Sequence, residues 1–167
     1  MNGFCDAIDR LNEVVGWLLG PVIILASGAI VYEVISRDMF EAPTIWANEG
    51  VVYGSAMVYL LAGGYALLHR RHVRIDMIFG MLSPRAVRIL DLLVLPFLIG
   101  YALTLVVVGG GIAWSSWLQA EGTGSPWNPR IWPVKACIPL AGLLLLLQAV
   151  SNTLRDQGLA ASRKVIR

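Results

Sequence analysis

Four long runs of the sequence contain no charged residue and no histidine. They cover residues 14–32, 50–68, 92–120 and 136–154. A helix needs about 20 predominantly apolar residues to cross the hydrocarbon core of a bilayer, so each run is long enough to span it. Lipid offers no hydrogen-bond partner to an exposed backbone, and the runs are therefore predicted to be helical. The sequence predicts an all-α integral membrane protein with four transmembrane helices.

We expect one membrane domain over residues 1–167, with spans at about 14–35, 47–68, 88–118 and 134–154. Composition agrees, because 57 % of the residues are hydrophobic and only 14 % are charged. A soluble domain has about 25 % charged residues. The first run follows acidic residues and not a basic segment, which favours an uncleaved membrane anchor over a signal peptide.

The basic residues divide unevenly between the two sides that four spans define. Ten of the 13 lysines and arginines fall in the N-terminal segment, the second connection and the tail. The other side holds only Arg37, Arg130 and Lys135. Cytoplasmic segments carry the excess of basic residues, so both termini are predicted to be cytoplasmic. Most tryptophans mark the opposite interface, whereas Trp17 lies near the inner end of the first run.

Two further segments are apolar but too short to span. Residues 4–15 place Phe4, Ile8, Leu11 and Val15 at helical spacing. This pattern predicts either a short interfacial helix or an extension of the first span into water. Residues 38–46 are predicted to dip into the outer interface.

Three ionisable residues lie near the outer membrane boundary. Glu33 and Arg37 are four residues apart at the end of the first span, a spacing that favours a pair on one helix face. Glu49 opens the second span on the same side. One interpretation is a proton or ion relay, because such residues usually face protein or a cavity. Their place at the boundary favours a structural cluster instead.

The residue pattern predicts no catalytic, cofactor-binding or metal site. Cys5 and Cys137 are too far apart for a short metal or redox motif. His69 and His72 lie in the second connection, whereas a haem anchor would need histidines within the spans. A net charge of +2 without a basic stripe also argues against a nucleic-acid partner.

A family resemblance is carried by residues that follow the first span and surround the second. They are Arg37, Trp46, Glu49, Gly64, His72, Arg74 and Asp76. The last three fall in the run HRRHVRIDMI at residues 69–78, and the outer segment TGSPWNPRIWPVK covers residues 123–135. With the four-span layout, these features resemble the small membrane subunit of tripartite ATP-independent periplasmic (TRAP) transporters, the DctQ-like family.

The resemblance implies a multi-pass protein of the bacterial inner membrane that is not an enzyme. Its partners would be a large multi-span permease subunit, a periplasmic solute-binding protein and membrane lipid. Such a complex imports organic acids, commonly carboxylates, with a sodium gradient. The substrate and sodium sites would lie in the large subunit, so this chain needs no cofactor and is expected to act as a scaffold. The seven residues are candidates for the interface with the partners.

Alternatives remain for both the site and the function. His72, Arg74 and Asp76 contact the large subunit in one interpretation and form an ordinary charge cluster in the other. The chain could also be a self-sufficient four-helix exporter, with Glu33 as its membrane carboxylate. A membrane anchor for a redox enzyme is a third possibility, opposed by the absence of histidine from the four runs.

Overall fold

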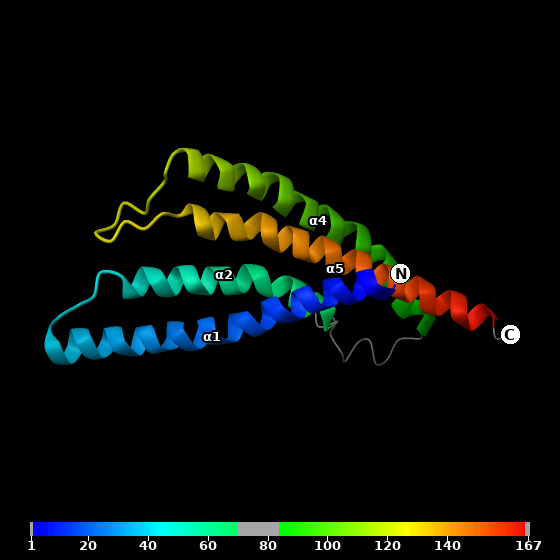
Figure 1. The fold of residues 1–167 in the computed structure, drawn as a ribbon, viewed down its shortest axis with the longest axis horizontal. Coiled ribbons are helices and arrows are strands. Elements are labelled where there is room, and N and C mark those ends of the chain that lie inside the picture. Colours follow the sequence, from blue (N-terminus) through cyan, green and yellow to red (C-terminus); the bar gives the residue numbers. More distant parts are fainter. Residues whose placement is uncertain (1, 70–83, 166–167) are drawn as a thin grey trace.

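A computed structural model describes residues 2–69 and 84–165 of the chain. These parts form helices α1 (Asn2–Phe40), α2 (Ala47–Leu68), α4 (Pro84–Leu118) and α5 (Trp132–Val165) (Figure 1). Each of these helices contains a stretch long and apolar enough to cross a membrane. The predicted all-α class with four spanning helices is therefore confirmed.

The helices run from one end of the molecule to the other and back. Both termini and the end of α2 lie at one end, which we call the terminal end (Figure 1). The connections 41–46 and 119–131 lie at the opposite end, which we call the loop end. The polar contacts between different helices and connections described below lie at these two ends or in the turns near them.

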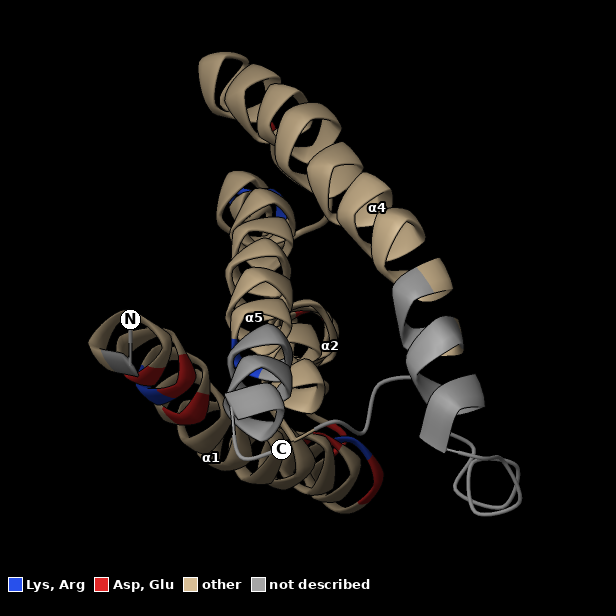
Figure 2. Ribbon diagram, turned by 90° about the vertical axis from the view of Figure 1, so that its right-hand side faces the viewer, with Lys and Arg blue, Asp and Glu red and all other residues tan. Residues whose placement is uncertain are grey.

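Helix α5 is the centre of the bundle. It packs against each of the other three helices, and α1 also packs against α2. Figure 2 shows α5 between α4 on one side and the pair of α1 and α2 on the other. As a result, 44 % of the apolar span of α5 is buried, against 6 % in α1 and 11 % in α2 and α4. The other helices keep broad apolar faces at the surface.

Glycines allow α4 and α5 to approach closely. A Cβ atom added to Gly142 would lie 2.8 Å from the backbone oxygen of Ala102. One added to Gly109 would lie 2.5 Å from a methyl carbon of Ile138. Real side-chain atoms do not tolerate such distances, so these two positions set how near the helices come. Gly110, by contrast, has no heavy atom within 4 Å of an added Cβ.

Residues 4–15 belong to α1 without a break, so the extension of the first span is the correct alternative. The face that packs inward consists of Cys5, Ile8, Asn12 and Leu19, which are all buried. Phe4 is 56 % exposed. The prediction holds for Ile8, but Cys5 and Asn12 are buried in place of Phe4 and Leu11, because the polar side chains of Asp9 and Asn12 turn toward α5.

We expect reporter fusions to place the two ends of the bundle on opposite sides of the membrane. Reporters fused at Glu41 and Gly124, in the loop-end connections, should read as periplasmic. A reporter after residue 160 should read as cytoplasmic, because cytoplasmic segments hold the basic excess. Paired alkaline phosphatase and green fluorescent protein fusions make the measurement. Phosphatase activity from the tail fusion would contradict the predicted orientation.

Candidate functional site

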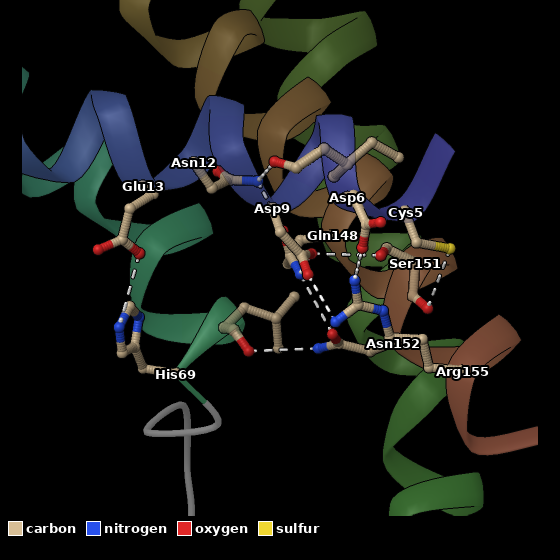
Figure 3. A network of polar contacts seen from close by, with 12 residues as sticks. Cys5, Asp6, Asp9, Asn12, Glu13, His69, Gln148, Ser151, Asn152 and Arg155 are labelled. Carbon is tan, nitrogen blue, oxygen red and sulfur yellow. Dashed lines mark hydrogen bonds and ion pairs between the residues drawn. The ribbon is translucent and has the colours of Figure 1, made fainter. Parts of the chain in front are cut away.

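The most buried polar side chains meet at the terminal end, where α1 crosses α5. Asn12 and Gln148 are both fully buried, and the Asn12 side-chain amide donates a hydrogen bond of 2.8 Å to the Gln148 side-chain oxygen (Figure 3). A buried amide without a partner is costly in an apolar environment. The pair therefore favours the arrangement of α1 and α5 in which the Asn12 nitrogen and the Gln148 oxygen are bonded, although the buried Asn12 side-chain oxygen has no partner among the described residues.

Gln148 extends this contact to a third helix. Its amide nitrogen donates to the Asp9 carboxylate at 2.9 Å and to the Asn152 side-chain oxygen at 3.2 Å. Asn152 in turn donates to the backbone oxygen of Leu67, in the last turn of α2, at 3.2 Å. An ionised carboxylate only accepts hydrogen bonds, so Asp9 fixes which way the Gln148 amide points. Helices α1, α2 and α5 are thus joined through one glutamine.

Arg155 forms the exposed edge of the network. One guanidinium nitrogen lies 2.6 Å from Asp6 and another lies 2.7 Å from Asp9. The Asp6 side chain is 67 % exposed, whereas that of Asp9 is only 18 % exposed. The contact with Asp9 therefore carries more weight, because ion pairs between exposed groups contribute only about 0–1 kcal/mol.

Sequence reasoning missed this network. Gln148 lies inside the run 136–154, which was located by the absence of charge, and an amide does not interrupt such a run. The available signal was the polar group itself, since polar side chains inside spans usually bond across helices. The second signal was the i, i+3 spacing of Asp9 and Asn12, which places both on one face of α1.

At the loop end, the predicted pairing of Glu33 with Arg37 is wrong. The two side chains form no ion pair, although the structure describes both residues. Glu33 is only 9 % exposed and accepts hydrogen bonds from the backbone nitrogen and the hydroxyl of Thr44. Arg37 is paired with its neighbour Asp38 at 3.0 Å. The guanidinium of Arg37 binds the carboxylate of Asp38 and not that of Glu33. Glu33 instead holds the connection between α1 and α2 through Thr44.

Trp46 and Glu49 also lie at the loop end. The Trp46 ring stacks on Tyr32 of α1 with 6.2 Å between ring centroids, and 43 % of the residue is exposed. Glu49 accepts a hydrogen bond of 3.3 Å from the Thr123 hydroxyl. Glu49 therefore ties the start of α2 to the connection between α4 and α5.

That connection, residues 119–131, is itself held in a defined shape. Gly122 and Arg130 form an isolated antiparallel bridge, and the Arg130 guanidinium donates to the backbone oxygen of Ala120. Lys135, in the first turn of α5, forms an ion pair with Glu121. The Lys135 ammonium lowers the pKa of the Glu121 carboxyl, so the carboxylate stays charged to a more acidic pH than usual.

Gly64 does not lie at a surface where a partner could bind. It is buried in α2, and a Cβ added there would lie 2.1 Å from the Asn12 side-chain oxygen and 3.0 Å from Leu144 Cβ. The expected interface role is therefore corrected to a packing role within the chain. The other predicted residues of this part, His72, Arg74 and Asp76, lie outside the described residues.

The interior of the spans holds few polar groups. Ser27 and Thr104 donate to backbone oxygens one turn earlier in their own helices, at 2.9 Å each. Within residues 2–69 and 84–165, no three histidine, cysteine or acidic side chains gather as a metal site would require. The described spans thus carry their polar contacts between helices at the two ends.

A comparison with protein families now adds to this geometry. Residues 26–158 match the model of the family described as tripartite ATP-independent periplasmic transporters, DctQ component. The chain belongs to the DctQ family. This match covers most of the chain and includes the apolar spans of α2, α4 and α5 and the part of α1 from residue 26 onward. A comparison with curated proteins found no match.

DctQ membership makes the chain a component of a transporter family and not of an enzyme family. It also agrees with the four spans of a multi-pass membrane protein. Asp9 and Asn12, which hold α1 to α5, lie before the first matched residue. The match includes the loop end and the C-terminal partners Gln148 and Arg155.

We expect Gln148→Leu to destabilise the bundle. The change leaves the Asn12 amide and the Asp9 carboxylate each without one hydrogen-bond partner, which costs about 1–3 kcal/mol when the group is buried. Thermal unfolding of the detergent-purified chain, followed by circular dichroism, measures the effect. Gln119→Leu is the matched control, because Gln119 is exposed at the loop end. Equal melting temperatures for the two variants would contradict the role of the network.

Two neighbouring glycines test the close contact between α1 and α2. Gly64→Ala should destabilise the isolated chain by about 1–3 kcal/mol, because its Cβ would displace Asn12 from Gln148. Gly63→Ala should be tolerated, since its Cβ would meet Leu145 at an ordinary 3.5 Å. The same unfolding assay compares them. If Gly64→Ala left the isolated chain intact and weakened only a complex, the packing role would be refuted.

Proposed function

We propose that the chain is the small permease subunit of a TRAP transporter and acts as a scaffold. Its partner would be a large multi-span permease subunit. That subunit would import an organic acid of the carboxylate class and would use a sodium gradient to drive the import. A periplasmic solute-binding protein would deliver the substrate. Substrate and sodium would bind to the large subunit, so this chain would contribute no ion site and no cofactor.

The proposal rests on the positions of the polar side chains in the described spans. A transport path through the chain would need polar side chains that converge within the membrane. In the described spans, the converging polar groups lie toward the two ends and bond to one another. Ser27 and Thr104 bond within their own helices. A chain built in this way is suited to holding a transport protein and not to forming a path.

The surface also suits a membrane partner. Ile24 of α1 and Phe97 of α4 are 72 % and 79 % exposed, and both lie on long apolar faces. Gly20, Gly28 and Gly110 have no heavy atom within 4 Å of an added Cβ. Small residues on an apolar helix surface let another helix approach closely. We propose that the large subunit packs on such faces.

The loop end offers polar contacts for the same partners. Arg37 and Trp46 are exposed there, and Glu49 is partly exposed beside Thr123. We propose that these three residues contact the large subunit or the docked binding protein. The same role is proposed for His72, Arg74 and Asp76 at the opposite side, on the basis of the family resemblance.

The orientation follows from charge. Ten basic residues on the side of the termini favour a cytoplasmic terminal end, with the chain in the bacterial inner membrane. The exporter alternative depends on Glu33, a carboxylate that is held by Thr44 at the loop end and is far from mid-span. That position favours the scaffold over the exporter.

We expect the chain alone, in liposomes with a sodium gradient, to move no carboxylate, because its described spans offer no converging polar groups at their centre. Uptake should begin when the large subunit is reconstituted with it and the binding protein is added. Radiolabelled C4-dicarboxylate and sialic acid serve as probes of two carboxylate classes. Sodium-dependent uptake by the chain alone would refute the scaffold role.

Glu33→Gln separates the scaffold from the exporter. An exporter would lose transport while its assembly stayed intact. In the scaffold, the amide loses the charge that Thr44 binds, and the yield of the complex should fall together with uptake. Co-purification of the large subunit provides the second measurement. Glu41→Gln, an exposed carboxylate in the same connection, is the control.

A further inference from the structure

A groove of about 640 Å³ lies between α1 and the end of α2 at the terminal end. It lies beside the face of α1 that packs on α5, and Asp9, which bonds to Gln148 and Arg155 of α5, forms its edge on that side. Its lining changes character along the helix. The polar part consists of Asp9, Arg10, Glu13 and His69, and the apolar part consists of Val14, Trp17, Leu18 and Leu68.

This change in polarity fits an amphipathic occupant. Arg10 and Leu18 are eight residues apart on α1, which is about 12 Å along a helix. Over that distance the wall passes from charged side chains to the exposed apolar groups of Val14, Trp17 and Leu18. Tryptophan favours the depth of lipid headgroups, where its ring is in apolar surroundings and its N–H is near water. A groove lined in this way matches the change from polar headgroups to acyl chains.

The charged part of the groove contains both acidic and basic side chains. The Glu13 carboxylate lies 3.7 Å from the outer ring nitrogen of His69, and their side chains are 42 % and 36 % exposed. The other His69 nitrogen lies 3.2 Å from the backbone oxygen of Tyr65. The Tyr65 ring packs against the His69 ring at a tilt of 38° and lies over Gly16, so the histidine is held in place. Figure 3 shows Glu13 and His69 facing each other, apart from the Asp9 and Arg155 cluster.

We propose that this groove binds a phospholipid whose headgroup carries a phosphate and a primary ammonium. The phosphate contacts Arg10 and the imidazole of His69. The ammonium donates hydrogen bonds to Glu13, and one acyl chain lies along Val14, Trp17 and Leu18. A choline headgroup has no N–H to donate, and a glycerol headgroup has no positive charge for Glu13. Among these three headgroups, the charge pattern therefore selects that of phosphatidylethanolamine.

The test is lipid binding by the intact chain in detergent micelles, measured by native mass spectrometry. The probes are dioleoyl phosphatidylethanolamine, phosphatidylcholine and phosphatidylglycerol, which share their acyl chains. We expect phosphatidylethanolamine to bind about tenfold more tightly than the other two. Glu13→Gln should abolish the preference over phosphatidylcholine. Glu13→Lys should shift the preference to phosphatidylglycerol, because it replaces the negative charge with a positive one.

Glu41→Gln at the loop end is the control and should keep the preference of the unmodified chain. Equal binding of the three lipids, or an unchanged preference in both Glu13 variants, would overturn the proposal. The measurement is repeated on the complex with the large subunit. Persistence of the preference there supports the lipid site. Its loss on complex formation would assign the groove to the subunit interface and would overturn the proposal. Neither lipid-binding measurement, on the chain alone or on the complex, depends on transport activity.

Discussion

The hydrogen bond between Asn12 and Gln148 is the contact on which the arrangement of the helices depends. The apolar faces of α1 and α5 could pack in several registers, because apolar contacts have little directionality. Two fully buried amides accept far fewer registers, since each misplaced group loses a hydrogen bond. The Asp9 carboxylate then orients Gln148, and Asn152 carries the contact to α2. One polar cluster thereby positions three helices.

The loop end is held by a different kind of contact. There the chain bonds to its own nearby connections, as Glu33 does with Thr44 and Lys135 with Glu121. Among the described residues, the hydrogen bond between Glu49 and Thr123 joins segments that are far apart in the sequence. Helix α4 is positioned mainly by shape, through Gly109 and Gly142 against α5. Directional bonds at the two ends and close apolar packing between them leave the outer faces free for lipid or protein.

The four spans could be predicted because their signal is local. A run without charge is visible in the sequence, and its length decides whether it crosses the bilayer. The polar network could not be predicted in the same way, because Asn12 and Gln148 are 136 residues apart. Helical spacing alone suggested Glu33 with Arg37, but Asp38 and Thr44 compete for the same groups. Gly64 shows the same limit, since its role depends on which side chain α1 presents to it.

The central place of α5 has a consequence for the order of synthesis. Asp9 and Asn12 are made early, and their partners Gln148 and Arg155 are made last among the paired residues. At about 5–20 residues per second, the ribosome needs on the order of ten seconds to pass from one group to the other. During that interval α1 holds a carboxylate and an amide without their partners. In a chain truncated before residue 148, Asp9 and Asn12 never meet Gln148 and Arg155. Truncated chains in the membrane therefore differ from full-length chains in having these polar groups of α1 without their partners on α5.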